Sequence, residues 1–363
     1  MTLRPLHVLM TADCVGGVWT YALDLARGLA ARNVRVTLAT MGVMPNDAQR
    51  AEAEVFPGLR LVSGPFKLEW EPEPWVDVDR AGEWLLGLER ELRPDVVHLN
   101  GYAHGNLPFI APCLVVGHSC VLSWWQAVKG GPAPPEWDTY RKQVRAGLHG
   151  ATAIVAPSQA MANALETLYG PFAFGGPLVI PNGRTMQSPA FRSRKPFVLS
   201  AGRFWDEAKN LQALLAVAPD LPLPVLVAGD CGNNVPAAPN MTALGCVPPA
   251  RLAELMSEAT IYALPARYEP FGLSVLEAAA SGCALVLGDI PSLRENWNEA
   301  ALFVPPNDTA ALTTAIDRLA QNDDLHHDLA RRALRRAQHF SLAAMVERYH
   351  DLYNTLLETA TCK

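Results

Sequence analysis

The sequence lacks the features that mark several protein classes. No apolar run in its 363 residues reaches the length of a bilayer-spanning helix. Acidic residues outnumber basic ones by 36 to 30, for a net charge of −6, which argues against a nucleic-acid partner. The first residues are typical of a strand followed by a glycine turn and not of a signal peptide. We therefore expect a cytoplasmic protein with no transmembrane segment.

Cysteine pairs that would indicate a metal site or a disulfide framework are also missing. The seven cysteines are scattered, odd in number and without a C-x-x-C pair. Most of them lie in apolar, strand-like runs, so we expect reduced, buried thiols. No zinc-ligand spacing is present.

What the sequence does contain is an alternation of short apolar runs and helical patterns. Leu6 to Met10 is a strand pattern, and Val34 to Thr40 is the next strand after a glycine turn and a helix. Such βαβ units predict parallel sheets. The length fits two domains better than one. Residues 188–196 are polar and basic with two prolines, as in a linker, and a fresh series of strands and helices begins at Phe197.

The stretch from Tyr262 to Gly288 concentrates residues that could carry chemistry. Its pattern is strand, loop, helix and strand, with the helix over Leu273 to Ala280. Two carboxylates lie in it, Glu269 on the loop and Glu277 on the helix. A glutamate in so apolar a helix is costly to bury without a partner, and ligand hydroxyls would provide one. The N–H groups at the helix start attract an anion.

A pair of cations lies near the start of the second domain. Arg203 follows the strand pattern over Phe197 to Ala201, and Lys209 precedes the helix over Leu211 to Val217. Two cations at a helix entrance predict a clamp for a diphosphate. With these cations and a helix start in place, no metal is required.

Three positions in the first domain are further candidates. Gly16 and Gly17, at the first helix start, could hold a phosphate or simply form a tight turn. His118 follows a strand at the sheet edge where ligands bind, although it could be a hydrogen-bonded core histidine. Trp124 and Trp125 could stack on an acceptor sugar, although tryptophan is more often a core residue.

The segment from Glu269 to Glu277, E-P-F-G-L-S-V-L-E, resembles the E-x7-E motif of retaining glycosyltransferase family 4, with Ser274 where valine is common. This resemblance implies an α/β GT-B fold, with two Rossmann-like domains whose parallel sheets face each other across a cleft. It implies an acceptor domain over residues 1–187, a donor domain over 188–342, and a C-terminal helix over 343–363 that packs back on the first domain.

The resemblance also implies roles for individual residues. Glu269 would lie against the donor sugar, Glu277 would hold the ribose, and His118 would reach the sugar's primary hydroxyl. The implied catalytic residues are Glu269, His118, Arg203 and Lys209. The implied donor-binding residues are Gly16, Gly17, Asn182, Arg203, Lys209, Val247, Glu269, Pro270, Phe271, Gly272, Leu273 and Glu277. Trp124 and Trp125 remain the acceptor candidates, and no residue is assigned to a metal.

A second histidine motif departs from the family. The segment DVVHLN resembles the family's D-x-V-H-x-H, with His98 at the first histidine and Asn100 in place of the second. We interpret His98 as structural.

The implied activity is transfer of a hexose from a nucleotide diphosphate sugar, with UDP or GDP favoured, to a hydroxyl of a saccharide, glycolipid or small molecule. The resemblance implies retention of configuration, and we expect no resident cofactor. Two alternatives stay open: a nucleotide-sugar epimerase of the same fold, and a catalytically silent sugar-binding subunit. The acceptor, the oligomeric state and peripheral contact with a membrane are not determined by the sequence.

Overall fold

The computed structural model describes residues 4–173, 175–185, 194–232 and 237–361. Contacts divide the chain into two units. Unit 1 contains Met1–Trp125, Gly131–Gly183 and Leu342–Lys363, and unit 2 contains Gln126–Gly130 and Arg184–Ser341. Most of the expected linker, residues 188–193, lies outside the described residues. Its last two residues, Lys195 and Pro196, already belong to the first strand of unit 2, so the expectation of a linker up to residue 196 was wrong there.

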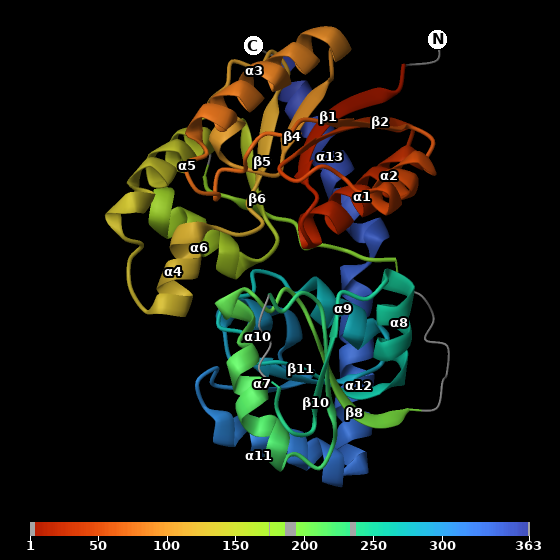
Figure 1. The fold of residues 1–363 in the computed structure, drawn as a ribbon. Coiled ribbons are helices and arrows are strands. Elements are labelled where there is room, and N and C mark those ends of the chain that lie inside the picture. Colours follow the sequence, from red (N-terminus) through yellow and green to blue (C-terminus); the bar gives the residue numbers. More distant parts are fainter. Residues whose placement is uncertain (1–3, 174, 186–193, 233–236, 362–363) are drawn as a thin grey trace. The chain divides into compact units, whose positions relative to one another are not determined.

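Unit 1 is built on a seven-stranded parallel sheet with the order β3-β2-β1-β4-β5-β6-β7 (Figure 1). The strands are β1 (Leu6–Asp13), β2 (Val34–Met41), β3 (Leu59–Ser63), β4 (Val96–Leu99), β5 (Cys113–Val116), β6 (Ala153–Ala156) and β7 (Leu178–Val179). The helices are α1 (Gly17–Ala30), α2 (Asp47–Glu54), α3 (Trp75–Leu92), α4 (Val121–Lys129), α5 (Asp138–Gly150), α6 (Gln159–Tyr169) and α13 (Leu342–Thr361), with 3-10 turns at η1 (Ala103–Asn106) and η2 (Pro135–Trp137). The strand order reverses between β1 and β4.

Unit 2 is built on a six-stranded parallel sheet with the order β10-β9-β8-β11-β12-β13. The strands are β8 (Lys195–Ala201), β9 (Val225–Ala228), β10 (Met241–Gly245), β11 (Ala259–Leu264), β12 (Ala284–Gly288) and β13 (Ala301–Val304). The helices are α7 (Leu211–Val217), α8 (Pro249–Glu258), α9 (Leu273–Ala280), α10 (Pro291–Trp297), α11 (Thr309–Gln321) and α12 (Asp323–Ala337), with 3-10 turns at η3 (Glu207–Lys209), η4 (Ala218–Asp220) and η5 (Gln338–Phe340). Here the order reverses between β8 and β11.

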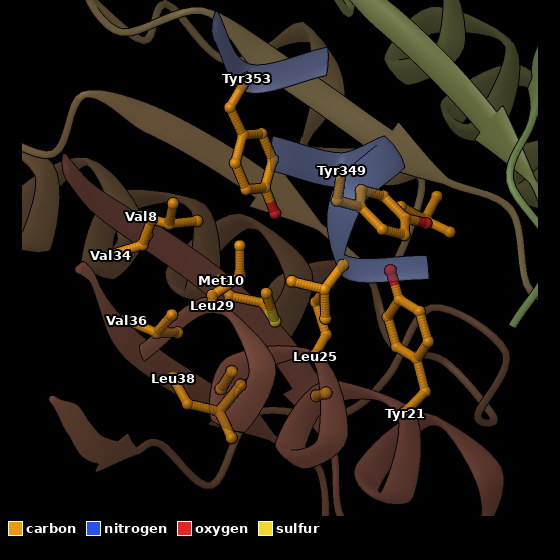
Figure 2. Packing of buried hydrophobic residues seen from close by; sticks show 14 of the residues in the cluster. Val8, Met10, Tyr21, Leu25, Leu29, Val34, Val36, Leu38, Tyr349 and Tyr353 are labelled. Atoms are coloured by element: carbon orange, nitrogen blue, oxygen red, sulfur yellow. The ribbon is translucent and has the colours of Figure 1, made fainter. Parts of the chain in front are cut away.

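The C-terminal helix α13 completes the core of unit 1, as the family resemblance implied. Figure 2 shows Tyr349 and Tyr353 of α13 on the same cluster as Leu25 and Leu29 of α1 and the apolar side chains of β1 and β2. At Gly28 the two helices come so close that an added Cβ would lie 2.2 Å from Cγ2 of Val346. Glycine at this position therefore allows α1 and α13 to pack together.

Most strand and helix expectations match the structure, but three elements were not expected. They are α2, β3 and α4, all in unit 1.

The burial of the cysteine thiols also differs from expectation. Among the described cysteines, Cys113, Cys120 and Cys283 are buried, whereas Cys14 and Cys231 are half-buried and Cys246 is exposed. All six are free thiols. No helix in the described parts of the chain is long and apolar enough to cross a membrane.

Candidate active site

In unit 2 the candidate residues follow the two strands between which the sheet order reverses. β8 and β11 are hydrogen-bonded neighbours. Arg203 comes after the end of β8, and Glu269 comes on the loop after β11. Because the carboxyl ends of parallel strands meet at one edge, the crevice at this reversal is where open α/β sheets bind ligands.

Lys209 reaches the same place through a tight turn. It ends η3, whose Ala208 N–H is capped by the Asp206 carboxylate at 2.9 Å. Asn210 follows in the left-handed conformation, with φ 58°, and its side-chain amide donates to the carbonyls of Pro265 and Pro306 at 2.8 and 2.7 Å. These contacts fix the turn, and with it the backbone of Lys209, against the loops after β11 and β13.

Lys209 and Glu269 form a close ion pair. Lys209 Nζ lies 2.6 Å from Glu269 Oε2, and the two side chains are only 13% and 14% exposed. The other oxygen, Oε1, accepts the N–H of Gly272 at 2.9 Å. Burial by itself raises the pKa of Glu269, but the charge and hydrogen bond of Lys209, a backbone N–H and the charge of Arg203 hold it below its usual range. Glu269 is therefore an ionised carboxylate at neutral pH.

The start of α9 carries the turn that the motif predicts. Gly272 is the N-cap of α9 with φ 90°, a conformation that glycine adopts without steric cost. Its N–H is already bonded to Glu269, so one of the expected donor-binding amides has an intramolecular partner in this structure. Pro270, Phe271 and Leu273 flank it, and Phe271 is buried against the core of unit 2.

Glu277 has a protein partner that sequence reasoning missed. Arg184 Nη2 lies 2.9 Å from Glu277 Oε1, and both side chains are about a quarter exposed. The partner is 93 residues away in the chain, just after the Pro-Asn-Gly element, and no spacing rule joins the two. Glu277 therefore avoids the cost of an unpaired charge in an apolar helix.

The family's common valine is replaced by a serine with a specific contact. Ser274 Oγ lies 2.8 Å from the hydroxyl of Tyr262 on β11, which also donates to the Ala201 carbonyl at the end of β8 at 3.0 Å. This hydroxyl pair ties the first turn of α9 to the two strands on either side of the reversal. The remaining donor candidate, Val247, is half-buried against the same core, after β10.

In unit 1, the glycine candidates and His118 follow two strands of the same sheet, β1 and β5, which are separated by β4. Gly16 has φ 84° and ψ −136° and precedes α1, which begins at Gly17. His118 follows β5, two strands from β1. Its Nε2 lies 2.8 Å from Oδ1 of Asn100, and its ring packs edge-on against Tyr21 with centroids 4.5 Å apart. Burial lowers the pKa of His118 to about 3, so the ring is neutral at physiological pH.

His98 is a core residue, as expected. It is fully buried, and its Nδ1 lies 2.7 Å from the hydroxyl of Tyr353 on α13. Asn182 is buried as well, and its side-chain oxygen has no hydrogen-bond partner among the described residues.

The tryptophan pair lies on a helix, α4. Trp124 and Trp125 belong to α4, are half-buried, and meet edge to face with centroids 5.8 Å apart. A shallow hollow that is open to solvent lies elsewhere in unit 1, beside Asn100 at the ends of β1 and β4. Trp70 lines it and is 41% exposed. Sequence reasoning missed Trp70, because nothing in its local pattern distinguishes it from a core residue.

No group of three or more metal-ligating side chains gathers anywhere in the described ranges. The carboxylates of the Asp77-Val78-Asp79 sequence lie within α3, where Asp77 pairs with Arg80, and are not part of such a group.

Two family models cover nearly all of this chain. Residues 15–187 match Glycosyltransferase Family 4, and residues 182–336 match Glycosyl transferases group 1. The chain belongs to glycosyltransferase family 4. As a family 4 glycosyltransferase it transfers a sugar from a nucleotide sugar.

Relatives of this glycosyltransferase include the D-inositol 3-phosphate glycosyltransferase of Nocardia farcinica, 26% identical over 97% of this chain and 87% of that protein. A shorter match, 36% identical, joins 27% of this chain to 26% of the O-antigen chain mannosyltransferase B of Escherichia coli. Among solved structures, sucrose-phosphate synthase from Thermosynechococcus elongatus superimposes with a TM-score of 0.79 over 98% of this chain and all of that one, at 21% identity. Anabaena HepE in complex with UDP and glucose superimposes with a TM-score of 0.71 over 96% and 100%, at 16% identity. These likenesses establish the GT-B fold.

Proposed function

We propose that this glycosyltransferase moves a hexose from a UDP- or GDP-sugar to a hydroxyl acceptor with retention and without a metal. The observation that carries the proposal is the buried Lys209–Glu269 pair at the start of α9, next to the charge of Arg203. A diphosphate needs cations and N–H groups, a sugar needs carboxylate acceptors, and this edge of unit 2 offers both. The UDP and UDP-glucose complexes of Anabaena HepE support the choice of donor class.

The existing contacts leave capacity for a substrate. An ammonium group has three N–H donors, and Glu269 uses one of those on Lys209, so two can face a phosphate. A carboxylate accepts about four hydrogen bonds, and the protein supplies two, so sugar hydroxyls can take the rest. The pair would then bind the donor without first separating.

In the proposed reaction the glycosidic bond to the diphosphate breaks as positive charge develops on the sugar ring. Arg203, Lys209 and the backbone N–H groups at the start of α9 would stabilise the departing negative charge, each by about 2.7–4 kcal/mol. We propose same-face transfer, with the leaving phosphate oxygen accepting the proton of the acceptor hydroxyl. The hollow beside Asn100 in unit 1, with its exposed Trp70, is our candidate for the acceptor site.

Donor hydrolysis in the absence of acceptor tests the activity. A panel of UDP-, GDP- and ADP-sugars is first screened by thermal shift, where a donor at 100 times its Kd should stabilise the protein by about 2.7 kcal/mol. The bound donor is then incubated with wild type, with Glu269→Ala and with Glu254→Ala, an exposed glutamate of α8 as control. Slow hydrolysis that only Glu269→Ala abolishes supports the proposal. Equal hydrolysis by all three contradicts it, and donor epimerisation without acceptor would favour the epimerase alternative.

A further inference from the structure

Two free thiols of unit 2 follow neighbouring strands at the same edge of the sheet. Cys231 comes shortly after β9, and Cys246 comes directly after β10. The two strands are parallel and hydrogen-bonded to each other, so their carboxyl ends meet at one edge. Neighbouring parallel strands lie about 4.8 Å apart, which is within the range of about 4.4–6.8 Å that separates the Cα atoms of a disulfide.

Backbone contacts at the strand ends place the two thiols near each other. The N–H of Gly229 donates to the carbonyl of Gly245 at 2.8 Å, which joins the segments that lead into Cys231 and Cys246. Cys231 turns back toward this bond, because its Sγ lies 3.6 Å from the Gly229 carbonyl oxygen. Burial, the Asp230 carboxylate and the charge of Cys246 together raise the pKa of the Cys231 thiol. The two thiols therefore lie close enough to interact electrostatically.

The two thiols differ in their access to solvent. Cys246 is exposed, whereas Cys231 is half-buried against the apolar cluster that contains α7 and α11. The backbone beside Cys246 has room to move, because a Cβ on Gly245 would meet no described atom within 4 Å. An oxidant in solution therefore reaches Cys246 first, and Cys231 is placed to attack the product.

We propose that Cys231 and Cys246 form a reversible disulfide when the protein meets oxidised glutathione, and that this cross-link weakens binding of the nucleotide sugar. The cross-link itself is independent of the proposed function. Its effect on the donor rests on that function, because it takes Arg203 as a contact of the diphosphate.

The reaction consists of two thiol–disulfide exchanges. The Cys246 thiolate attacks one sulfur of oxidised glutathione, the S–S bond of glutathione breaks, and one glutathione thiolate leaves. The Cys231 thiol then loses its proton to water and attacks Sγ of Cys246, which releases the second glutathione. Two electrons and two protons pass in total from the protein to oxidised glutathione, giving one protein disulfide and two molecules of reduced glutathione.

The segment that leads into Cys231 also supports the loop of Arg203. The carbonyl of Asp230 accepts the N–H groups of Phe204 and Trp205 at 2.6 and 3.2 Å. Drawing Cys231 toward the end of β10 moves this carbonyl, and with it the loop that presents Arg203. The disulfide therefore changes the donor edge of unit 2 without modifying any residue of the candidate site.

The cross-link can be measured on the full chain without any substrate. The protein is incubated with oxidised glutathione, the remaining thiols are alkylated, and disulfides are located by peptide mass spectrometry. We expect a bond between Cys231 and Cys246 in wild type and in the control Cys14→Ser, which removes a half-buried thiol of unit 1. In Cys231→Ser, glutathione should stay on Cys246, because the second thiol is missing.

The wild-type result decides the cross-link by itself, so the proposal stays testable if a serine variant does not fold. Glutathione that stays on Cys246 in wild type, a bond to another cysteine, or no reaction overturns the proposal.

The effect on the donor is measured by thermal shift with a nucleotide sugar that binds the reduced protein. We expect a Kd about tenfold higher for cross-linked than for reduced wild type, because charge-assisted hydrogen bonds of Arg203 are lost. Dithiothreitol should restore the affinity, and Cys246→Ser treated with the same oxidant should keep it. An unchanged Kd after complete cross-linking overturns the effect on the donor. If no nucleotide sugar binds the reduced protein, the proposed function fails, while mass spectrometry still decides the cross-link.

Discussion

The two parallel sheets reverse strand order in the same way but carry opposite kinds of site at the reversal. In unit 2, β8 and β11 present charges: Arg203, Lys209 and Glu269, with the ion pair nearly buried. In unit 1, β1 and β4 present the neutral groups of Asn100 and Thr11, beside the neutral His118. An identical topology therefore fixes where ligands are held but not the chemistry that holds them.

The difference determines which ligands each edge suits. The cations of unit 2 suit an anionic group such as a diphosphate. The neutral groups of unit 1 suit a neutral polar ligand, which they would bind through hydrogen bonds alone.

The contrast between the two units would be contradicted most clearly if the charged residues of unit 2 were not needed for catalysis. We expect Lys209→Met to lower kcat about 10²–10³-fold, because it removes a donor that stabilises the leaving diphosphate. Donor hydrolysis measured beside Lys195→Met provides the control, since Lys195 is an exposed lysine of the same unit. Similar activities for the two variants would mean that the ion pair is structural only.

We expect the next largest effect from a substitution at Gly229, where two backbone segments come close together at the edge of unit 2. A Cβ on Gly229 would lie 1.9 Å from the Gly202 carbonyl oxygen, just before Arg203. We expect Gly229→Ala to lower the free energy of unfolding by about 3 kcal/mol and to weaken donor binding, since the clash displaces the Arg203 loop. Gly245→Ala has a positive φ of 65° but open space, so strain alone should cost about 1–2 kcal/mol. Urea titrations in which Gly245→Ala proved the more damaging would contradict this.

We expect a smaller loss of stability when a hydrogen bond between neutral side chains of unit 1, His98 and Tyr353, is removed. Tyr353→Phe leaves Nδ1 of His98 without its hydrogen-bond partner, and we expect the free energy of unfolding to fall by about 1–2 kcal/mol. Tyr349→Phe is the comparison on the same helix, because the Tyr349 hydroxyl meets only the hydroxyl of Tyr21, which keeps His98 as a second partner. Its removal should therefore cost less. Equal losses in thermal unfolding of the two variants would argue against the hydrogen bond.

We expect the smallest effect in the pH dependence of stability, which tests whether Glu269 of unit 2 is ionised in the folded protein. The folded pKa of Glu269 is held below 4.5, so its ionised form stabilises the fold above about pH 4.5, and this contribution disappears as the pH falls through the folded pKa. The difference in urea midpoint between wild type and Glu269→Gln should therefore shrink below pH 4.5. A difference that grows in acid would show that the folded pKa is raised instead.

Secondary structure is predicted best from the sequence where the start signal, the apolar pattern and the stop signal of an element lie in one short stretch. The bounds of α9 match the expected helix, because the loop, the glycine and the apolar run are contiguous. By contrast α2 has an apolar face made only of alanines, so its periodicity is weak, although the Asn46–Gln49 capping box was a readable start signal.

The partners of the candidate residues are harder to predict, because they depend on which strands become neighbours. Arg184 meets Glu277 across 93 residues, and the Asn100 side chain is held by the main-chain oxygen of Thr11, a group that every amino acid has. A family motif indicates that Glu269 and His118 matter. It does not show that Glu269 is paired and ionised or that His118 is a neutral ring beside Asn100.

The return of α13 to unit 1 has a consequence during synthesis. The strands β1 to β7 leave the ribosome first, but the helix that covers Tyr21 and Leu29 is encoded by the last residues of the chain, beyond all of unit 2. The half of the protein that is translated first is therefore the last to be finished. A nascent chain stopped before Leu342 would display an open apolar face to chaperones.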